Sequence, residues 1–166
     1  MPVEVVDESA DDRADGDADA PPSPLAERSV VIAEAILECV DRAGSELSIA
    51  LVGDERMREL NREWRGKDST TDVLSFSQLE GEALVSSSAA LGDVVISVDV
   101  LRRQAADGGW TEDEELARLL LHGVLHLLGF DHERDDDAAV MHREEARVVG
   151  ELQSRGIACA WEGEGA

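Results

Sequence analysis

Three of the four histidines in this chain lie within eleven residues, at His122, His126 and His132. Side chains four residues apart share one face of a helix at about 5–6 Å, so the first two imidazoles can approach the same point. Gly129 can end that helix in the left-handed conformation, and the reversed chain can bring His132 back towards the other two. Three neutral nitrogens that leave a fourth position open are typical of catalytic zinc. The spacing therefore predicts one zinc ion per chain.

Two histidines on an apolar helix could instead be satisfied core side chains. The surrounding segment, LARLLLHGVLHLLGF, is so apolar that both imidazoles would need buried partners, and each unsatisfied group would cost about 1–3 kcal/mol. A shared metal ion removes that cost for both. Zinc suits imidazole ligands and an open tetrahedral site, although nickel and copper also bind them. His142 stands at no ligand spacing and is predicted to lie on the surface.

The same spacing, H-x-x-x-H-x-x-G-x-x-H, is that of metzincin peptidases, in which a glutamate general base directly follows the first histidine. Gly123 occupies that place here. Without the carboxylate the usual activation of water for peptide hydrolysis is missing, so a metallopeptidase is an alternative rather than the first interpretation. Asp131 and Glu133 flank the third histidine and could orient an imidazole or accept a proton, although helix capping is the commoner role of such acids.

The apolar pattern predicts an α+β domain, a mixed α/β arrangement in which helices pack on a small mixed sheet. The expected strands are 2–6, 47–52, 72–76 and 91–98. Four helices are expected. The first begins at Ser23 and Pro24 and ends at Gly44, the second is capped by Asp54 and ends at Gly66, the third begins at a Thr111–Glu114 capping box and ends at Gly129, and the fourth covers about 135–154. Residues 9–23 are acidic, contain proline and are predicted to be a disordered insertion.

Length and composition fit one domain with its own core, at 166 residues and 43% hydrophobic. No apolar run approaches the ~20 residues of a membrane span, and the N-terminal segment lacks the features of a signal peptide. We therefore expect a cytoplasmic protein without a membrane partner. Cys39 and Cys159 match no ligand or redox spacing and are predicted to be reduced and structural.

The formal net charge of −23 argues against binding to nucleic acids, since affinity for phosphates comes mainly from lysine and arginine. The acidic residues are concentrated in 1–20, 112–115 and 133–145, however, whereas residues 54–67 carry five basic and four acidic groups. Fourteen of the fifteen basic side chains are arginines, whose planar guanidinium groups bind phosphate oxygens in pairs. An RNA substrate is therefore not excluded by charge alone.

Three blocks, LNREWRGKDSTTDVLSFS, LGDVVIS and HGVLHLLGFDHE, resemble the YbeY family of metal-dependent endoribonucleases, and the likeness runs from about residue 2 to residue 153. The resemblance implies a zincin-like fold and hydrolysis of single-stranded RNA, in maturation of the 3′ end of 16S ribosomal RNA and in ribosome quality control. The family's zinc-binding histidines match His122, His126 and His132, and its functional arginine matches Arg65. Without the resemblance, a surface salt bridge from Arg65 to Glu63 or Asp68 would be the simpler interpretation.

The resemblance also sets the expected organisation and partners. Residues 1–155 are predicted to form a single endoribonuclease domain and residues 156–166 a C-terminal tail. The expected partners are single-stranded ribosomal RNA, ribosomal particles and assembly proteins, with no DNA, and the chain is expected to be a monomer. A third hypothesis is a non-catalytic ribosome-assembly factor whose metal only stabilises the fold.

Overall fold

The computed structural model describes residues 3–9, 23–78, 90–130 and 135–161. In chain order the elements are β1 (Val3–Asp7), α1 (Pro24–Cys39), β2 (Glu46–Val52), α2 (Asp54–Arg65), β3 (Val73–Ser77), β4 (Ala90–Ser97), α3 (Val98–Gly108), α4 (Glu112–Leu127) and α5 (Asp135–Ser154). The predicted α+β class is confirmed. Most of the predicted insertion, and the segment that contains His132, lie outside the described residues. None of the described helices is both long enough and apolar enough to cross a membrane.

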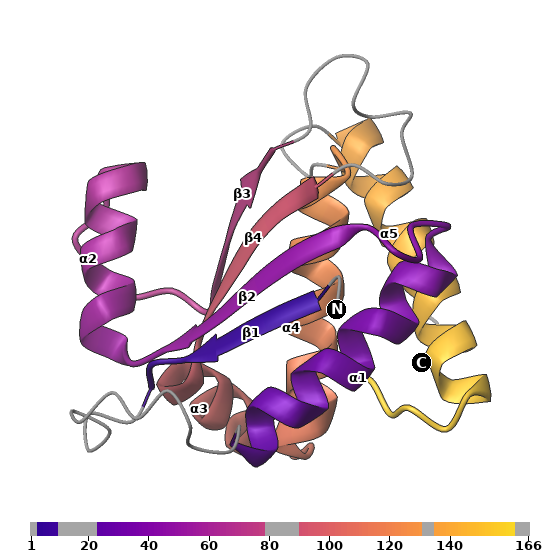
Figure 1. Cartoon of the computed structure of the whole chain (residues 1–166), viewed down its shortest axis with the longest axis horizontal. Helices are drawn as coiled ribbons and strands as arrows, with labels where there is room; N and C mark the ends of the chain where they lie inside the picture. Colours follow the sequence, from indigo (N-terminus) through magenta and orange to yellow (C-terminus); the bar gives the residue numbers. More distant parts are fainter. Residues whose placement is uncertain (1–2, 10–22, 79–89, 131–134, 162–166) are drawn as a thin grey trace.

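The strands form one mixed sheet in the order β1-β2-β4-β3. β1, β2 and β4 run parallel, while β3 is antiparallel to β4 and forms one edge of the sheet. Helices α1 and α4 pack against one face of the sheet, and α2 stands on the other side (Figure 1). The edge strand β3 therefore lies between α4 and α2.

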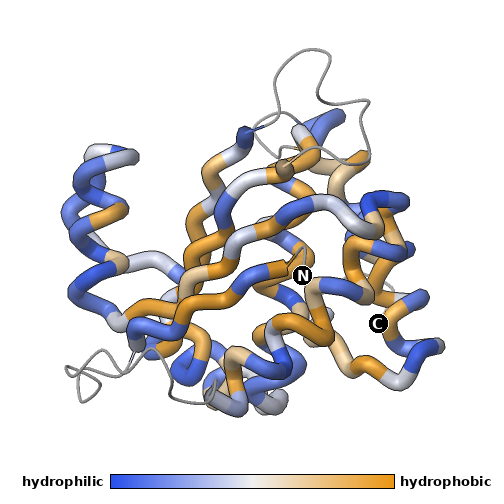
Figure 2. Tube along the Cα trace, in the orientation of Figure 1, coloured by the Kyte–Doolittle hydropathy of each residue, from blue (hydrophilic) through white to orange (hydrophobic). Residues whose placement is uncertain are grey.

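Alternation along the strands divides the apolar side chains between the two faces. Ile49, Val94 and Ile96 belong to the main core beneath α1 and α4. Val52 and Val95 point to the opposite face, where they pack with Met57 of α2 in a smaller cluster. The strands are largely apolar while α2 is mostly hydrophilic (Figure 2). Helix α2 thus contacts the sheet through few side chains and leaves most of its surface in solvent.

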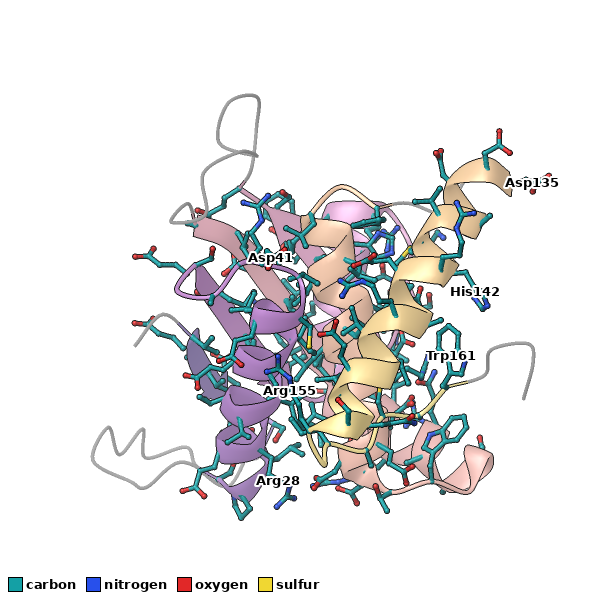
Figure 3. The ribbon with its side chains drawn as sticks, turned by 90° about the vertical axis from the view of Figure 1, so that its right-hand side faces the viewer. Arg28, Asp41, Asp135, His142, Arg155 and Trp161 are labelled. Atoms are coloured by element: carbon teal, nitrogen blue, oxygen red, sulfur yellow. The ribbon has the colours of Figure 1, made fainter. Side chains whose placement is uncertain are left out.

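The last described residues pack back onto the domain. Cys159 and Ala160 are buried, and the Ala160 N–H donates a hydrogen bond to the Glu114 carbonyl at 3.0 Å. The Trp161 ring lies 4.8 Å from that of His142 on α5 (Figure 3). His142 is exposed, as the sequence predicted.

Both cysteines are free and buried. Burial raises the pKa of the Cys39 thiol to about 11. The pKa of the more deeply buried Cys159 rises to about 12 for the same reason. Since the thiolate is the reactive form, both side chains act as small apolar groups at neutral pH.

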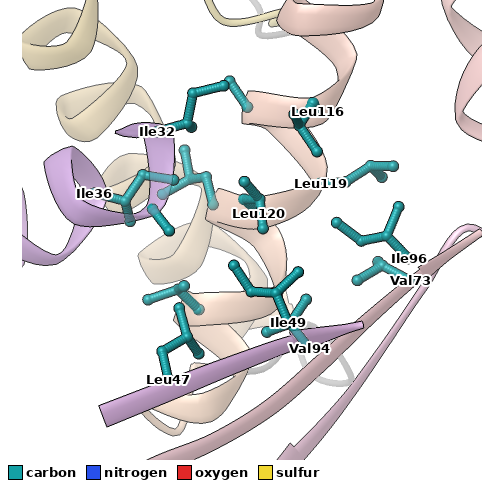
Figure 4. Close-up of a cluster of buried hydrophobic side chains, with 14 of the residues drawn as sticks. Ile32, Ile36, Leu47, Ile49, Val73, Val94, Ile96, Leu116, Leu119 and Leu120 are labelled. Carbon is teal, nitrogen blue, oxygen red and sulfur yellow. The ribbon is translucent and has the colours of Figure 1, made fainter. Parts of the chain in front are cut away.

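Helix α4 lies almost directly on the sheet. Thr111 and Glu114 form the predicted capping box at its start, and its leucines fill the space above β2, β3 and β4 (Figure 4). A Cβ added at Gly123 would stand 2.8 Å from a methyl carbon of Val94. The Gly123 carbonyl also accepts a hydrogen bond of 3.1 Å from the Ser75 hydroxyl. The absence of a side chain at this position allows α4 to approach so closely.

The structure differs from the sequence prediction in one element. Helix α3 was not predicted, and the strand expected over 91–98 ends at Ser97, whose hydroxyl accepts from the Val100 N–H and begins this helix. The predicted strand includes Val98, and Val100 and Leu101 belong to no predicted element, whereas all three are buried helical side chains.

Two helix ends also differ. Helix α1 stops at Cys39 rather than continuing to Gly44, because Asp41 takes a left-handed φ of 58°. Aspartate tolerates that conformation better than most residues do. The N-cap of α2 is Gly53 rather than Asp54, which is the first helical residue.

Replacement of two helical glycines by alanine should have opposite effects on the free energy of unfolding. We expect Gly123→Ala to lower the free energy of unfolding by about 1–2 kcal/mol, because overpacking against Val94 outweighs the gain in helix propensity. At the matched control position Gly150 in α5, a Cβ would meet nothing within 4 Å, so Gly150→Ala should stabilise by about 0.5–1 kcal/mol. Urea unfolding monitored by circular dichroism measures both. Equal stability of the two variants would contradict the packing described here.

Candidate functional site

A cavity of about 710 Å³ opens along the outer edge of β3. Its lining combines the end of α2, the whole of β3 and the end of α4, namely Trp64, Arg65, residues 71–77, His122, His126, Leu127, Gly129 and Phe130. Side chains alternate between the faces of a strand, so an unbroken run of lining residues means that the edge itself faces the cavity. Thr71 and Asp72, which directly precede the strand, also lie in this lining.

The two described histidines of the predicted triad converge in this cavity. The Nε2 atoms of His122 and His126 are 3.0 Å apart, and their ring centroids are 4.5 Å apart. Two ligands at about 2.0–2.1 Å from one tetrahedral zinc would be separated by about 3.4 Å, so the pair needs only a small adjustment to share an ion. Both rings are partly exposed. The donor chemistry and the spacing therefore fit a metal ion.

The third predicted ligand is not tested. His132 and its neighbours Asp131 and Glu133 lie outside the described residues. Among the residues that the structure describes, no group of three or more histidine, cysteine, aspartate or glutamate side chains could hold a metal ion. The complete triad stays a prediction. Gly129, predicted to end the helix, has a left-handed φ of 97° just beyond α4.

A carboxylate stands behind the first histidine. Glu145 Oε1 on α5 lies 3.9 Å from the Nδ1 atom of His122. Metal-binding histidines commonly have such an acceptor beside the nitrogen that does not bind the ion, where it favours one tautomer and one ring orientation. Sequence reasoning missed Glu145, because no local spacing connects a residue of α5 to a residue of α4.

Arg65 is the last residue of α2, and Gly66, in the left-handed conformation, ends the helix as predicted. The Arg65 side chain is exposed and lines the cavity. Within the described part of the chain Arg65 makes no ion pair. Asp68 instead accepts two hydrogen bonds from Arg58, at 2.8 and 3.0 Å. The surface salt bridge considered from the sequence is therefore absent from the described residues, and the guanidinium is left for a ligand.

Hydrogen bonds at both ends hold α2 in place. At its start, the Asp54 carboxylate accepts from Arg103 at 2.9 Å and from the Ser97 hydroxyl at 3.2 Å. The Arg103 guanidinium and the Ser97 hydroxyl hold the pKa of Asp54 below its usual range despite partial desolvation. Near its end, the buried Asn61 side chain donates to the Ser69 carbonyl at 2.8 Å. These contacts fix the position of Arg65 relative to the sheet.

An ion-pair network lies one to two helical turns before His122. Glu115 is fully buried, and both of its oxygens accept from Arg118, at 2.6 and 2.7 Å. Arg118 also donates to Gln104 at 3.1 Å and lies 3.9 Å from the Asp72 carboxylate. The network links α4 to α3 and to the residue before β3, so it orients the helix that carries the histidines.

Comparison with known proteins identifies the family. The family model described as Endoribonuclease YbeY matches residues 23–153. The chain belongs to the YbeY family. A YbeY relative from Anaeromyxobacter sp. (strain Fw109-5) is 53% identical over 117 residues, which cover 70% of this chain and 59% of the relative. Another, from Sulfurihydrogenibium sp. (strain YO3AOP1), is 45% identical over 124 residues, 75% of this chain and 76% of the relative.

The chain spans about three-fifths of the length of the two Anaeromyxobacter relatives that it matches, 59% in each case. A solution structure of a Thermotoga maritima protein is similar to this YbeY-family chain with a TM-score of 0.54. The similarity covers 98% of this chain and 99% of that one at 21% sequence identity. It therefore supports the fold alone.

Removal of the arginine from the buried ion pair should destabilise the domain. We expect Arg118→Leu to lower the free energy of unfolding by about 3 kcal/mol, because the Glu115 carboxylate would remain buried without its partner. The control is Arg102→Leu, since Arg102 and Glu112 form an exposed pair at 3.4 Å and such pairs contribute at most about 1 kcal/mol. The double variant Arg118→Leu/Glu115→Leu should recover much of the loss in chemical denaturation. A loss no larger than that of Arg102→Leu would disprove the structural role of the network.

Proposed function

We propose that this chain is a metal-dependent endoribonuclease that cleaves single-stranded RNA. In this proposal His122, His126 and His132 hold one zinc ion and Arg65 binds the scissile phosphate. The observation that carries the proposal is the convergence of two histidine Nε2 atoms, 3.0 Å apart, in the same cavity that Arg65 lines. Membership of the YbeY family and the endoribonuclease names of the relatives support the choice of RNA as substrate.

The residues of the cavity suit a phosphodiester. Zinc, when bound, would supply Lewis-acid polarisation of a phosphoryl oxygen. Neutral imidazole ligands add no negative charge, so the site stays electropositive in a chain of formal net charge −23. The Arg65 guanidinium can donate two parallel hydrogen bonds to non-bridging oxygens, whose negative charge grows as the phosphodiester is attacked. Arg65 thus orients the phosphate and stabilises the developing charge.

Peptide hydrolysis is the second candidate, because the edge of β3 lines the cavity and peptides commonly bind to exposed strand edges. The position of the missing general base weighs against it. Gly123 is buried against Val94 and Ser75, so a carboxylate there would face the sheet rather than the cavity. Incubation of the zinc-loaded chain with a peptide library tests this candidate directly.

We further propose that the RNA is ribosomal, with maturation of the 3′ end of 16S RNA and ribosome quality control as the biological setting in the cytoplasm. The strongly acidic composition gives the isolated chain few groups to attract RNA, since Arg65 is the one arginine in the described lining of the cavity. A monomer that acts on RNA presented by ribosomal particles or assembly proteins is consistent with that charge.

Loss of one histidine should abolish both metal binding and cleavage. We expect His126→Ala to lose its stoichiometric zinc in elemental analysis and to cleave a single-stranded RNA at least about 100-fold more slowly than the wild type, because the charge stabilisation supplied by the metal is lost. The control His142→Ala alters an exposed histidine on α5 and should retain both properties. Wild-type rates in His126→Ala would refute the assigned chemistry.

Substitution of the arginine should slow the reaction without removing the metal. We expect Arg65→Ala to lower kcat by about 10²–10³-fold and Arg65→Lys to restore it only partly, because lysine lacks the planar pair of donors. Arg62→Ala, on the same helix but outside the cavity lining, serves as control. If Arg65→Ala retained full activity in the cell while chelation of zinc unfolded the protein, the non-catalytic assembly factor would be the better description.

A further inference from the structure

Trp64, the residue before Arg65, is the largest exposed apolar side chain among the described residues, with 64% of its surface accessible. Single exposed apolar residues are common and need no special explanation. This one differs because it lines the same cavity as Arg65 and the two histidines. An aromatic surface beside an arginine is the usual composition of a site for single-stranded nucleic acid.

The indole is held in a defined orientation. Its ring lies 5.7 Å from that of Phe76 on β3, at an interplanar angle of 67°, in an edge-to-face contact. Phe76 in turn packs against the cluster that joins α2 to the sheet. The contact occupies only part of the indole, since most of Trp64 remains accessible. The ring therefore needs little further ordering before a planar ligand stacks on it.

We propose that Trp64 stacks on an unpaired nucleobase next to the phosphate that Arg65 binds. The inference rests on the proposed function, because it assigns a base-binding role to a neighbour of the phosphate-binding residue. Every base has a flat apolar surface, so stacking on Trp64 is tolerant of sequence. A base within a duplex is already stacked and paired, and it must be extruded before an aromatic side chain can reach it. Trp64 thereby makes the site selective for single strands.

Four variants separate stacking from other effects. Trp64→Phe keeps an aromatic face, Trp64→Leu keeps apolar bulk without one, and Trp64→Ala removes both. Val31→Ala is the control for loss of an exposed apolar side chain, because Val31 is 61% accessible and lies on α1, away from the cavity lining. Circular dichroism spectra check that each variant is folded.

Binding is measured without cleavage, in EDTA, with a single-stranded RNA that carries 2-aminopurine as a fluorescent base. We expect Trp64→Ala and Trp64→Leu to weaken binding by about 5- to 150-fold, whereas Trp64→Phe and Val31→Ala stay close to the wild type. An abasic ribose-phosphate strand should bind the wild type and Trp64→Ala equally. With zinc and cleavable RNA, Trp64→Leu should raise KM while kcat changes less.

The outcomes distinguish the two proposals. If the zinc-loaded wild type cleaves RNA but Trp64→Leu binds the aminopurine strand as well as Trp64→Phe does, stacking is wrong and the endoribonuclease proposal stands. If the wild type neither binds nor cleaves RNA, both proposals fail. Weak binding by Trp64→Leu together with unchanged binding of a duplex would support Trp64 as the source of single-strand preference.

Discussion

The close approach of α4 to the sheet at Gly123 is the constraint on which the site depends. The helix touches Val94 of β4 there and accepts a hydrogen bond from Ser75 of β3. With that face of α4 fixed against the strands, the face that carries His122 and His126 must point past the edge of the sheet. The same contact explains why no general base of the metzincin type stands after the first histidine, since a larger side chain would separate the helix from the sheet.

The edge strand β3 joins the two halves of the cavity. Ser75 and Ser77 donate hydrogen bonds to carbonyls of α4, while Leu74 and Phe76 pack on the side of α2. One face of β3 thus contacts α4, which carries the histidines, and the other face contacts α2, which carries Arg65. The open edge of β3 lies between these two helices. Any change in the register of β3 would move both helices relative to each other.

The ion pairs of the described residues leave a positively charged side chain exposed at the cavity of an acidic chain. Buried Glu115 is matched by Arg118, and Asp54 is matched by Arg103, so these carboxylates are neutralised within the fold. Arg65, by contrast, has no ion pair among the described residues and is exposed at the cavity. The overall charge of −23 therefore says little about the potential at the site, where the Arg65 guanidinium and the imidazoles of His122 and His126 line one cavity.

The sequence by itself determined the features that depend on local backbone geometry. The spacing of His122 and His126, the capping box of α4 and the glycine that ends α2 follow from helical periodicity and from hydrogen bonds within a few residues. Tertiary structure alone decided the contacts between distant segments: the packing at Gly123, the carboxylate of Glu145, and the Trp64–Phe76 pair. Those contacts depend on strand order and register, which no pattern within one segment records. Helix α3 was missed for the same reason, since its apolar residues fit a strand equally well until the packing of the sheet is known.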